Sequence, residues 1–167
     1  EGAVLLILSD RAITSETLSI PAAMAVGAVQ RCLVENNVRC DSNIIVETAS
    51  VKDSHHFAVL FGLGATAVYP YLVYESLAQQ VEEGSLAMDL GEAISNYRKG
   101  IDKGLLKILS KMGIATIASY RCSQLFEAVG ISKEVTELCF NGVVSRIEGA
   151  GFDDFQQDLE KMNSYGW

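Results

Sequence analysis

Short apolar runs alternate with amphipathic stretches along most of the chain. Runs of aliphatic and β-branched residues, which are typical of buried strands, fall at 3–8, 43–46, 65–69 and 114–118. Apolar residues at helical spacing predict helices at 22–36, 55–62, 71–83, 93–111, 123–129, 132–138 and 152–162. The stretch 139–147 fits neither pattern. Strands that alternate with helices indicate parallel βα units, so we predict an α/β fold.

The predicted strands are apolar on both sides rather than alternating. Such strands are covered by helices on both faces of a sheet, or they stand in the wall of a barrel. Four βα units are too few for a closed eight-stranded barrel. Two architectures therefore remain, a partial, TIM-barrel-like unit and an open sheet flanked by helices.

Local signals set several of the predicted boundaries. Pro21 suits the first turn of a helix, and Asp53 or Ser54 can cap the next one. Gly113 is placed to stop the long helix at 93–111, whose core side we predict to be a stripe of four apolar residues. That stripe is Ile101, Leu105, Ile108 and Met112. The polar stretch 82–92 is expected to be a mobile connection.

Composition favours one acidic globular domain. The 167 residues are 49% hydrophobic and 20% charged, with a formal net charge of −8. An acidic chain argues against a non-specific nucleic-acid binder. No signal peptide or run long enough to span a membrane is visible, so we expect a cytoplasmic protein. Because Glu1 stands where Met is usual, we expect residues 1–167 to be a fragment of a longer polypeptide.

The four cysteines do not form a recognisable metal motif. They are scattered through the sequence, and no C-x-x-C pair is present. We therefore expect no zinc or iron–sulfur site, and predict small buried hydrophobic side chains. These residues are Cys32, Cys40, Cys122 and Cys139.

Polar and aromatic residues follow each predicted strand. In βα folds ligands collect at the carboxyl ends of strands, where loops and helix starts converge. Two interpretations stand, a polar pocket or interdomain surface on one side, and helix capping with surface solvation on the other. Because rim position is the only support for the first, the second is preferred. The residues are Ser9, Asp10, Arg11, Glu47, Thr48, Tyr69, Tyr71, Ser119, Tyr120 and Arg121.

Two other features match functional motifs only superficially. His55 and His56 are adjacent, so on a helix they point about 100° apart and do not readily chelate one metal. We expect one surface and one half-buried histidine. The segment 62–67 fits G-x-G-x-x-A, but it leaves a helix and enters a strand, which reverses the dinucleotide-binding geometry. We interpret it as a tight turn.

The predicted helix at 93–111 carries a basic stripe. Lys99, Lys103, Lys107 and Lys111 recur every four residues. Five cations and one carboxylate give the segment 96–111 a net charge of +4, which leaves −12 on the rest of the chain. A solvated face is the preferred interpretation, and the alternative is a stripe that binds phosphate or docks on an acidic partner surface. Gly100 and Gly104 predict close approach by another element.

No nucleophile elbow, P-loop or H-E-x-x-H motif is present. Instead, an ordered series of segments from about residue 3 to residue 161 closely resembles the central domain of the large subunit of bacterial glutamate synthase. These segments are LLILSDR (5–11), IPAAMAVGA (20–28), IVETA (45–49), HHFAVLFGLGATAVYPY (55–71), NYRKGIDKGL (96–105), SKMGIATIASYR (110–121) and LFEAVG (125–130). The resemblance is to the C-terminal part of that domain.

The resemblance implies a piece of a multidomain oxidoreductase. In that family an N-terminal amidotransferase domain hydrolyses glutamine, and ammonia passes through a tunnel to an FMN-binding barrel. There it reacts with 2-oxoglutarate, and reduction gives glutamate. Electrons arrive through an iron–sulfur cluster, from NADPH by way of a small subunit or from ferredoxin. The central domain joins the two active sites, helps to line the tunnel and carries no flavin.

The family's catalytic residues have no counterpart here, since the chain lacks an N-terminal cysteine, a cysteine cluster and a full barrel. We therefore expect a non-catalytic connecting domain with no cofactor of its own, whose partners are the amidotransferase and FMN-binding domains of one parent chain. The alternative is an independent partial-barrel enzyme that binds FMN or another phosphorylated ligand. A third possibility is a protein-docking module that uses the lysine stripe.

Overall fold

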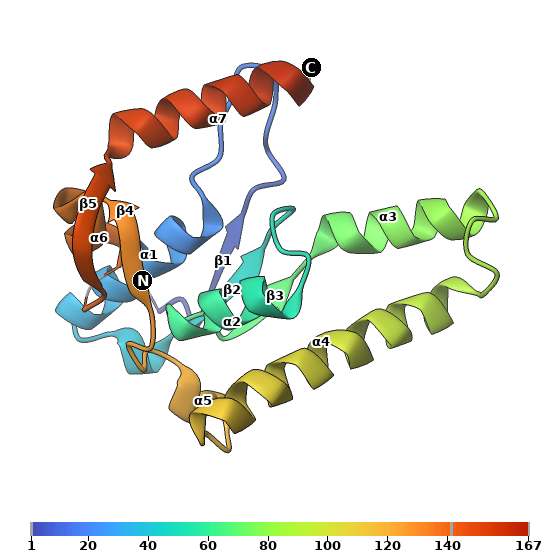
Figure 1. Ribbon diagram of the computed structural model, residues 1–167, viewed down its shortest axis with the longest axis horizontal. Helices are drawn as coiled ribbons and strands as arrows, with labels where there is room; N and C mark the ends of the chain where they lie inside the picture. Colours follow the sequence, from blue (N-terminus) through green and yellow to red (C-terminus); the bar gives the residue numbers. More distant parts are fainter. Residues whose placement is uncertain (1, 141, 167) are drawn as a thin grey trace.

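The computed structural model describes residues 2–140 and 142–166. It confirms the α/β class, with parallel strands in open sheets flanked by helices and no closed barrel among the described residues (Figure 1). The elements in chain order are β1 (Leu5–Ser9), α1 (Ala22–Glu35), the 3-10 turn η1 (Arg39–Asp41), β2 (Asn43–Glu47), α2 (Ser54–Gly62), β3 (Ala67–Tyr69), α3 (Tyr71–Glu82), α4 (Leu90–Met112), α5 (Ile117–Tyr120), β4 (Glu127–Ile131), α6 (Lys133–Cys139), β5 (Val144–Ala150) and α7 (Phe152–Gly166).

The first sheet contains β1, β2 and β3 in that order, all parallel. Its central strand, β2, turns Ile44 and Val46 to one face, where both are buried under helices. Val26 from α1 and Leu60 from α2 pack into the same core. Helix α1 connects β1 to β2, helix α2 connects β2 to β3, and both cover this face. Packing against these helices holds the apolar runs at 43–46 and 65–69 as strands beside β1.

The other face of the first sheet is open, so coverage by helices on both faces, one of the two arrangements predicted for such strands, is wrong for this sheet. Leu5 and Ile7 point to it and are 59% and 64% exposed, and Tyr69 is 44% exposed. The physical reason is the path of α3. That helix leaves the end of β3 and packs against α4 instead of returning over the sheet, and it buries none of its residues (Figure 1).

Helices α3 and α4 form a long hairpin that projects away from the sheets (Figure 1). Asp89 caps the start of α4 by accepting a hydrogen bond from the Glu92 amide at 3.0 Å. Gly113 ends the helix in the left-handed region with φ 69°, and the Ile114 amide donates to the Leu109 carbonyl at 3.0 Å. The polar stretch 82–92 therefore contains the turn of the hairpin and the first residues of α4.

The predicted core stripe of α4 is confirmed in part. Ile101 is buried, and Leu105 and Ile108 pack partly buried against the core. Met112 is 44% exposed, however, and Leu109 takes the buried position at that end of the helix. In the last turn of α4, Leu109 therefore faces α2 and α5 in place of the predicted Met112.

The predicted strand at 114–118 is wrong. Thr116 caps the short helix α5 by accepting a hydrogen bond from the Ser119 amide. Ile114 and Ile117 pack with the buried Tyr120 and Leu109, so their apolar character serves a helix-to-helix contact. A short apolar run satisfies either environment equally well, which explains the error.

The predicted helix at 123–129 is also wrong. Cys122 and Gln124 both adopt φ 55°, which breaks any helix there, and the chain continues as strand β4. Strand β4 pairs in parallel with β5, and α6 connects the two. The ambiguous stretch 139–147 holds the end of α6 and the start of β5, and Asn141 within it lies outside the described residues.

The predicted helices at 132–138 and 152–162 are confirmed as α6 and α7. Helix α6 packs so closely on α1 that a Cβ atom at Gly27 would overlap the Cys139 carbonyl oxygen. Helix α7 reaches back over the segment that follows β1, where the Asn163 amide donates to the carbonyls of Thr14 and Ser15. In the described part of the chain, no helix has the length and apolar character needed to cross a membrane.

Candidate functional site

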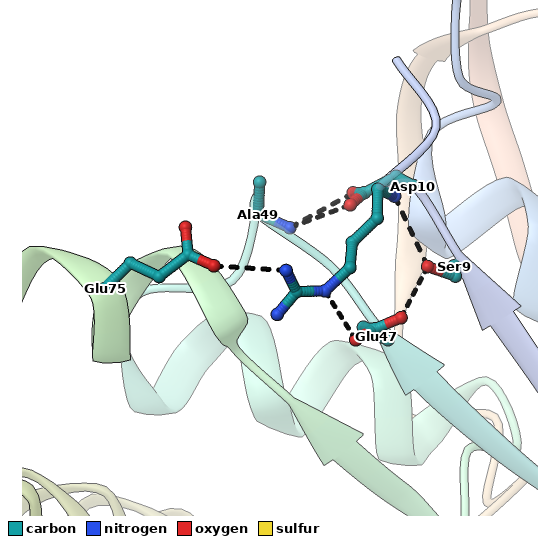
Figure 2. A network of polar contacts seen from close by, with 6 residues as sticks. Ser9, Asp10, Glu47, Ala49 and Glu75 are labelled. Atoms are coloured by element: carbon teal, nitrogen blue, oxygen red, sulfur yellow. Dashed lines mark hydrogen bonds and ion pairs between the residues drawn. The ribbon is translucent and has the colours of Figure 1, made fainter.

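The carboxyl ends of β1 and β2 hold a network of charged residues, shown in Figure 2. Parallel pairing sets Ser9 opposite Glu47, and the Ser9 hydroxyl donates to Glu47 Oε2 at 2.6 Å. Arg11 Nε donates to Glu47 Oε1 at 2.7 Å. Both oxygens of Glu47 are thus bound by its neighbours, and the Ser9 hydrogen bond, followed by the Arg11 contacts, holds the pKa of Glu47 below its ordinary value.

Arg11 joins this network to the hairpin. Its Nη1 donates to Glu75 Oε1 of α3 at 3.1 Å, and its guanidinium lies 4.1 Å from the centre of the Tyr71 ring. Two carboxylates and an aromatic face therefore surround one cation. The network fixes the first turns of α3 against the ends of the first two strands.

Asp10 organises the loop after β2. Thr48 Oγ1 donates to Asp10 Oδ2 at 2.5 Å, and the Ala49 amide lies 3.1 Å from both carboxylate oxygens. Thr48 is buried, so the carboxylate satisfies a hydroxyl that has little contact with water. Burial, followed by the neighbouring Asp10, raises the pKa of Tyr71 to about 12, so that hydroxyl stays protonated at neutral pH.

A cleft of about 410 Å³ lies beside the network. Its walls come from the ends of β1 and β2, from the segment 18–20 and from the start of α1. Polar atoms of Ser9, Asp10, Glu47 and Thr48 meet apolar side chains of Leu18 and Ile20 there. The carboxylates of Asp10 and Glu47, which line the cleft, already accept hydrogen bonds from the chain.

Ser119 and Arg121 lie elsewhere, because no strand forms at 114–118; residues 114–116 have no regular structure, and Ser119 lies within α5. Ser119 Oγ lies 3.0 Å from Thr116 Oγ1 in the first turn of α5. Arg121 Nη1 donates to Thr66 Oγ1 at 3.1 Å, and the Thr66 hydroxyl donates to Asn43 Oδ1 at 3.3 Å. Asn43 begins β2, so Arg121 is at the amino-terminal edge of the sheet, opposite the network around Glu47.

Sequence reasoning missed two members of these polar clusters. Glu75 lies one helical turn after Tyr71, on the same side of α3. Because α3 starts beside the strand ends, this spacing places Glu75 next to them. Arg39 donates to the Ser42 carbonyl at 2.7 Å and to the Gly64 carbonyl at 3.0 Å, which ties the amino-terminal edge together. No local pattern in the sequence signals that second contact.

The residues at the strand ends do not suit a flavin phosphate. Arg11, which follows the cleft residue Asp10, is held by Glu47 and Glu75. The carboxylates of Asp10 and Glu47 face the cleft and would repel an anion. These residues therefore give no support to an FMN site at this edge.

The cysteines do not suit an iron–sulfur cluster either. They come from α1, η1, the segment after α5, and α6, and all four are free. Only Cys139 is buried, so the prediction of small buried hydrophobic side chains is wrong for the other three. Among the described residues no group of three or more His, Cys, Asp and Glu side chains is placed to hold a metal ion.

The histidines and the glycine-rich turn behave as expected. His55 is exposed and His56 half-buried, and both backbone amides donate to Asp53, which caps α2. Gly64 adopts φ 121° in the turn between α2 and β3, where the Ala65 amide donates to the Leu60 carbonyl at 2.9 Å. The interpretation of segment 62–67 as a tight turn is confirmed.

Comparison with known proteins assigns the chain to a family. The family model described as "Glutamate synthase central domain" matches residues 1–132. The chain is 38% identical over 183 residues to the glutamate synthase [NADPH] large chain of Bacillus subtilis, covering all of this chain and 12% of that protein. It is 44% identical over 164 residues to the glutamate synthase [NADPH] large chain of Azospirillum brasilense, with 98% and 11% covered.

A plant relative gives the same result. The ferredoxin-dependent glutamate synthase 1 of Arabidopsis thaliana is 41% identical over 169 residues, which cover 94% of this chain and 10% of that protein. The chain thus spans about a tenth of the length of these curated relatives.

Proposed function

This chain belongs to the glutamate synthase central domain family, and we propose that it is a single, non-catalytic domain of a longer glutamate synthase chain. Its role there is to connect the glutamine amidotransferase domain to the FMN-binding synthase domain. It also helps to line the path that ammonia takes between them. FMN and the iron–sulfur cluster belong to other parts of that chain, which receives electrons from an NADPH-oxidising small subunit or from ferredoxin.

One observation carries the proposal, namely that the charged groups at the strand ends are bound to one another. Glu47 is held by Ser9 and Arg11, and Asp10 by Thr48 and Ala49. A catalytic base or nucleophile has to be within reach of a substrate proton or carbon. Here the same groups tie together the loops that follow β1 and β2, which suits a rigid wall.

The cleft beside the network suits the passage of a small polar molecule. Its lining mixes hydroxyl and carboxylate oxygens with apolar side chains. Its volume of about 410 Å³ is many times the volume that one water molecule occupies in the liquid, roughly 30 Å³. Ala25 of α1 lies in its wall. A larger side chain at this position would narrow the cleft from the side of α1.

A flavin titration tests the first part of the proposal. The purified chain, shown to be folded by circular dichroism, is titrated against FMN while flavin fluorescence is followed. We expect no saturable quenching, and no glutamate from glutamine and 2-oxoglutarate when the chain acts alone. Saturable quenching that weakens in an Arg11→Ala variant would overturn the proposal in favour of an independent flavin-binding enzyme.

A coupling measurement in the complete parent enzyme tests the ammonia path. In an Ala25→Trp variant we expect glutamine hydrolysis to continue while less glutamate forms per glutamine consumed, and free ammonia to accumulate. Glutamate formation from added ammonium should be preserved, which separates a blocked path from a damaged synthase site. Gly100→Ala, in open space on α4, is the control. Unchanged coupling in Ala25→Trp would remove the cleft from the path.

A further inference from the structure

The outward side of α4 carries a basic surface bordered by an exposed apolar side chain. Lys99, Lys103 and Lys107 recur at helical spacing on the side opposite Ile101, and all three are exposed. Leu106 lies at one edge of these lysines and is 64% exposed. With Lys111 at its other margin, we name this surface the basic face of α4.

The four lysines of this face have no ion-pair partner in the described part of the chain. Lysines four residues apart on a helix repel each other, and Asp102, the one carboxylate of the segment 96–111, forms no ion pair with them in the described structure to offset that repulsion. An opposing carboxylate surface would relieve it.

The hairpin also keeps the basic face away from the rest of the domain. Helix α4 projects from the sheets beside α3, and its other side packs on α2 and α3 (Figure 1). The stripe from Lys99 to Lys111 spans twelve residues, or about 18 Å at 1.5 Å per helical residue. Over that length the charges drift around the helix by about 120°, so they face the space beyond the domain along a curved stripe.

We propose that the basic face of α4 docks on an acidic protein surface elsewhere in the same longer chain. This inference rests on the proposed function, since it gives the connecting domain one of its contacts. The exposed Leu106 beside the lysines favours a protein over a nucleic acid, because protein interfaces combine apolar contacts with polar ones. The net charge of −12 on the remaining residues would also repel a polyanion.

The length of the relatives favours a partner within the same chain. This chain covers 10–12% of the curated relatives compared above, so most of such a polypeptide lies outside it. Exposed ion pairs contribute little individually. Tethering raises the effective concentration of the partner surface, which lets a weak charged contact persist.

Lysine acetylation followed by mass spectrometry tests the proposal in the complete parent enzyme. We expect Lys99, Lys103 and Lys107 to react several-fold more slowly there than in the isolated folded chain. Lys133, which is 72% exposed on α6, provides the reference rate in both samples. Equal rates for the three α4 lysines in both samples would overturn the proposal.

A charge-reversed variant adds a second measurement. In the parent enzyme carrying Lys103→Glu and Lys107→Glu, we expect Lys99 to lose its protection, whereas Lys133→Glu should leave that protection intact. Protection that disappears on dilution would identify a second copy of the chain, and protection removed by nuclease a nucleic acid; either result overturns the same-chain docking. The ammonia-coupling ratio of Ala25→Trp is measured separately, so failure of one proposal does not imply failure of the other.

Discussion

At the scale of single residues, Glu47 shows how the sheet edge is stabilised. Its carboxylate accepts hydrogen bonds from Ser9 and Arg11, and only 23% of its side chain is exposed. These donors favour the charged form, so the pKa of Glu47 in the native state lies below its ordinary value of 4.5. The unfolded chain therefore binds more protons than the native one as the pH falls through this range.

Thermodynamic linkage turns that difference into a pH-dependent stability. The contribution of the Glu47 charge is fully present above pH 4.5 and is lost as the pH falls through the lower native pKa. We expect Glu47→Gln to lower the Tm at pH 7, with a difference from the unsubstituted chain that narrows under acid. Glu16→Gln, outside the network, is the control. If the Tm difference had the same size at pH 7 and at pH 3, the destabilisation would come from altered hydrogen-bond geometry and not from the lost charge of Glu47.

At the scale of secondary-structure elements, two glycines on α4 have opposite roles. A Cβ atom at Gly104 would fall on the side chain of Ser54, the first residue of α2, whereas at Gly100 it would meet nothing within 4 Å. The predicted close approach is therefore confirmed for Gly104 and wrong for Gly100. Gly104 sets how closely α2 and α4 pack, and Gly100 only weakens the helix.

Alanine substitutions separate these roles. Gly100→Ala should stabilise the chain by about 0.5–1 kcal/mol through helix propensity. Gly104→Ala should destabilise it by about 1–3 kcal/mol, because the added methyl group overpacks the contact with α2. Chemical denaturation measures both. Adding Ser54→Gly to Gly104→Ala should recover part of the loss, and strict additivity of the two substitutions would contradict the proposed clash.

The elements up to Gly113 were predictable because local chemistry marks their ends. Pro21, Asp53, Pro70 and Gly113 each stand at the helix boundary where their backbone or side-chain preference places them. Between residues 114 and 131 such signals fail. The left-handed backbone at Cys122 and Gln124 is adopted by residues that seldom take it, so residue types alone do not reveal the break.

The same limit applies to the candidate site. The approach of Ser9 and Arg11 to Glu47 follows from parallel strands that end at one edge of the sheet, so topology alone predicts it. The grouping of Ser119 and Arg121 with them depended on a strand at 114–118, and it failed with that strand. The contact to Glu75 requires the direction of α3 after Pro70, a tertiary property that no local pattern encodes.

At the scale of the whole molecule, the first sheet is covered on only one face. Sheets of parallel strands are ordinarily covered on both, and Leu5 and Ile7 on the open face are 59% and 64% exposed. An apolar sheet face in water favours association with other apolar surfaces. We therefore expect the isolated chain to self-associate as its concentration rises.

Threonine substitutions on the two faces test this expectation. Ile7→Thr keeps a β-branched strand residue, so we expect weaker self-association in sedimentation velocity and a change in stability within about 0.5 kcal/mol. Ile44, on the neighbouring strand, is fully buried on the covered face. Ile44→Thr should therefore destabilise the chain by about 2 kcal/mol or more, since it removes buried apolar contacts and buries a hydroxyl.

If Ile7→Thr proved as destabilising as Ile44→Thr, the second face would be covered within this chain. If Ile7→Thr self-associated as strongly as the unsubstituted chain, the surface responsible for self-association would lie elsewhere. The exposed Val129 and Ile147 of the second sheet would then be substituted next.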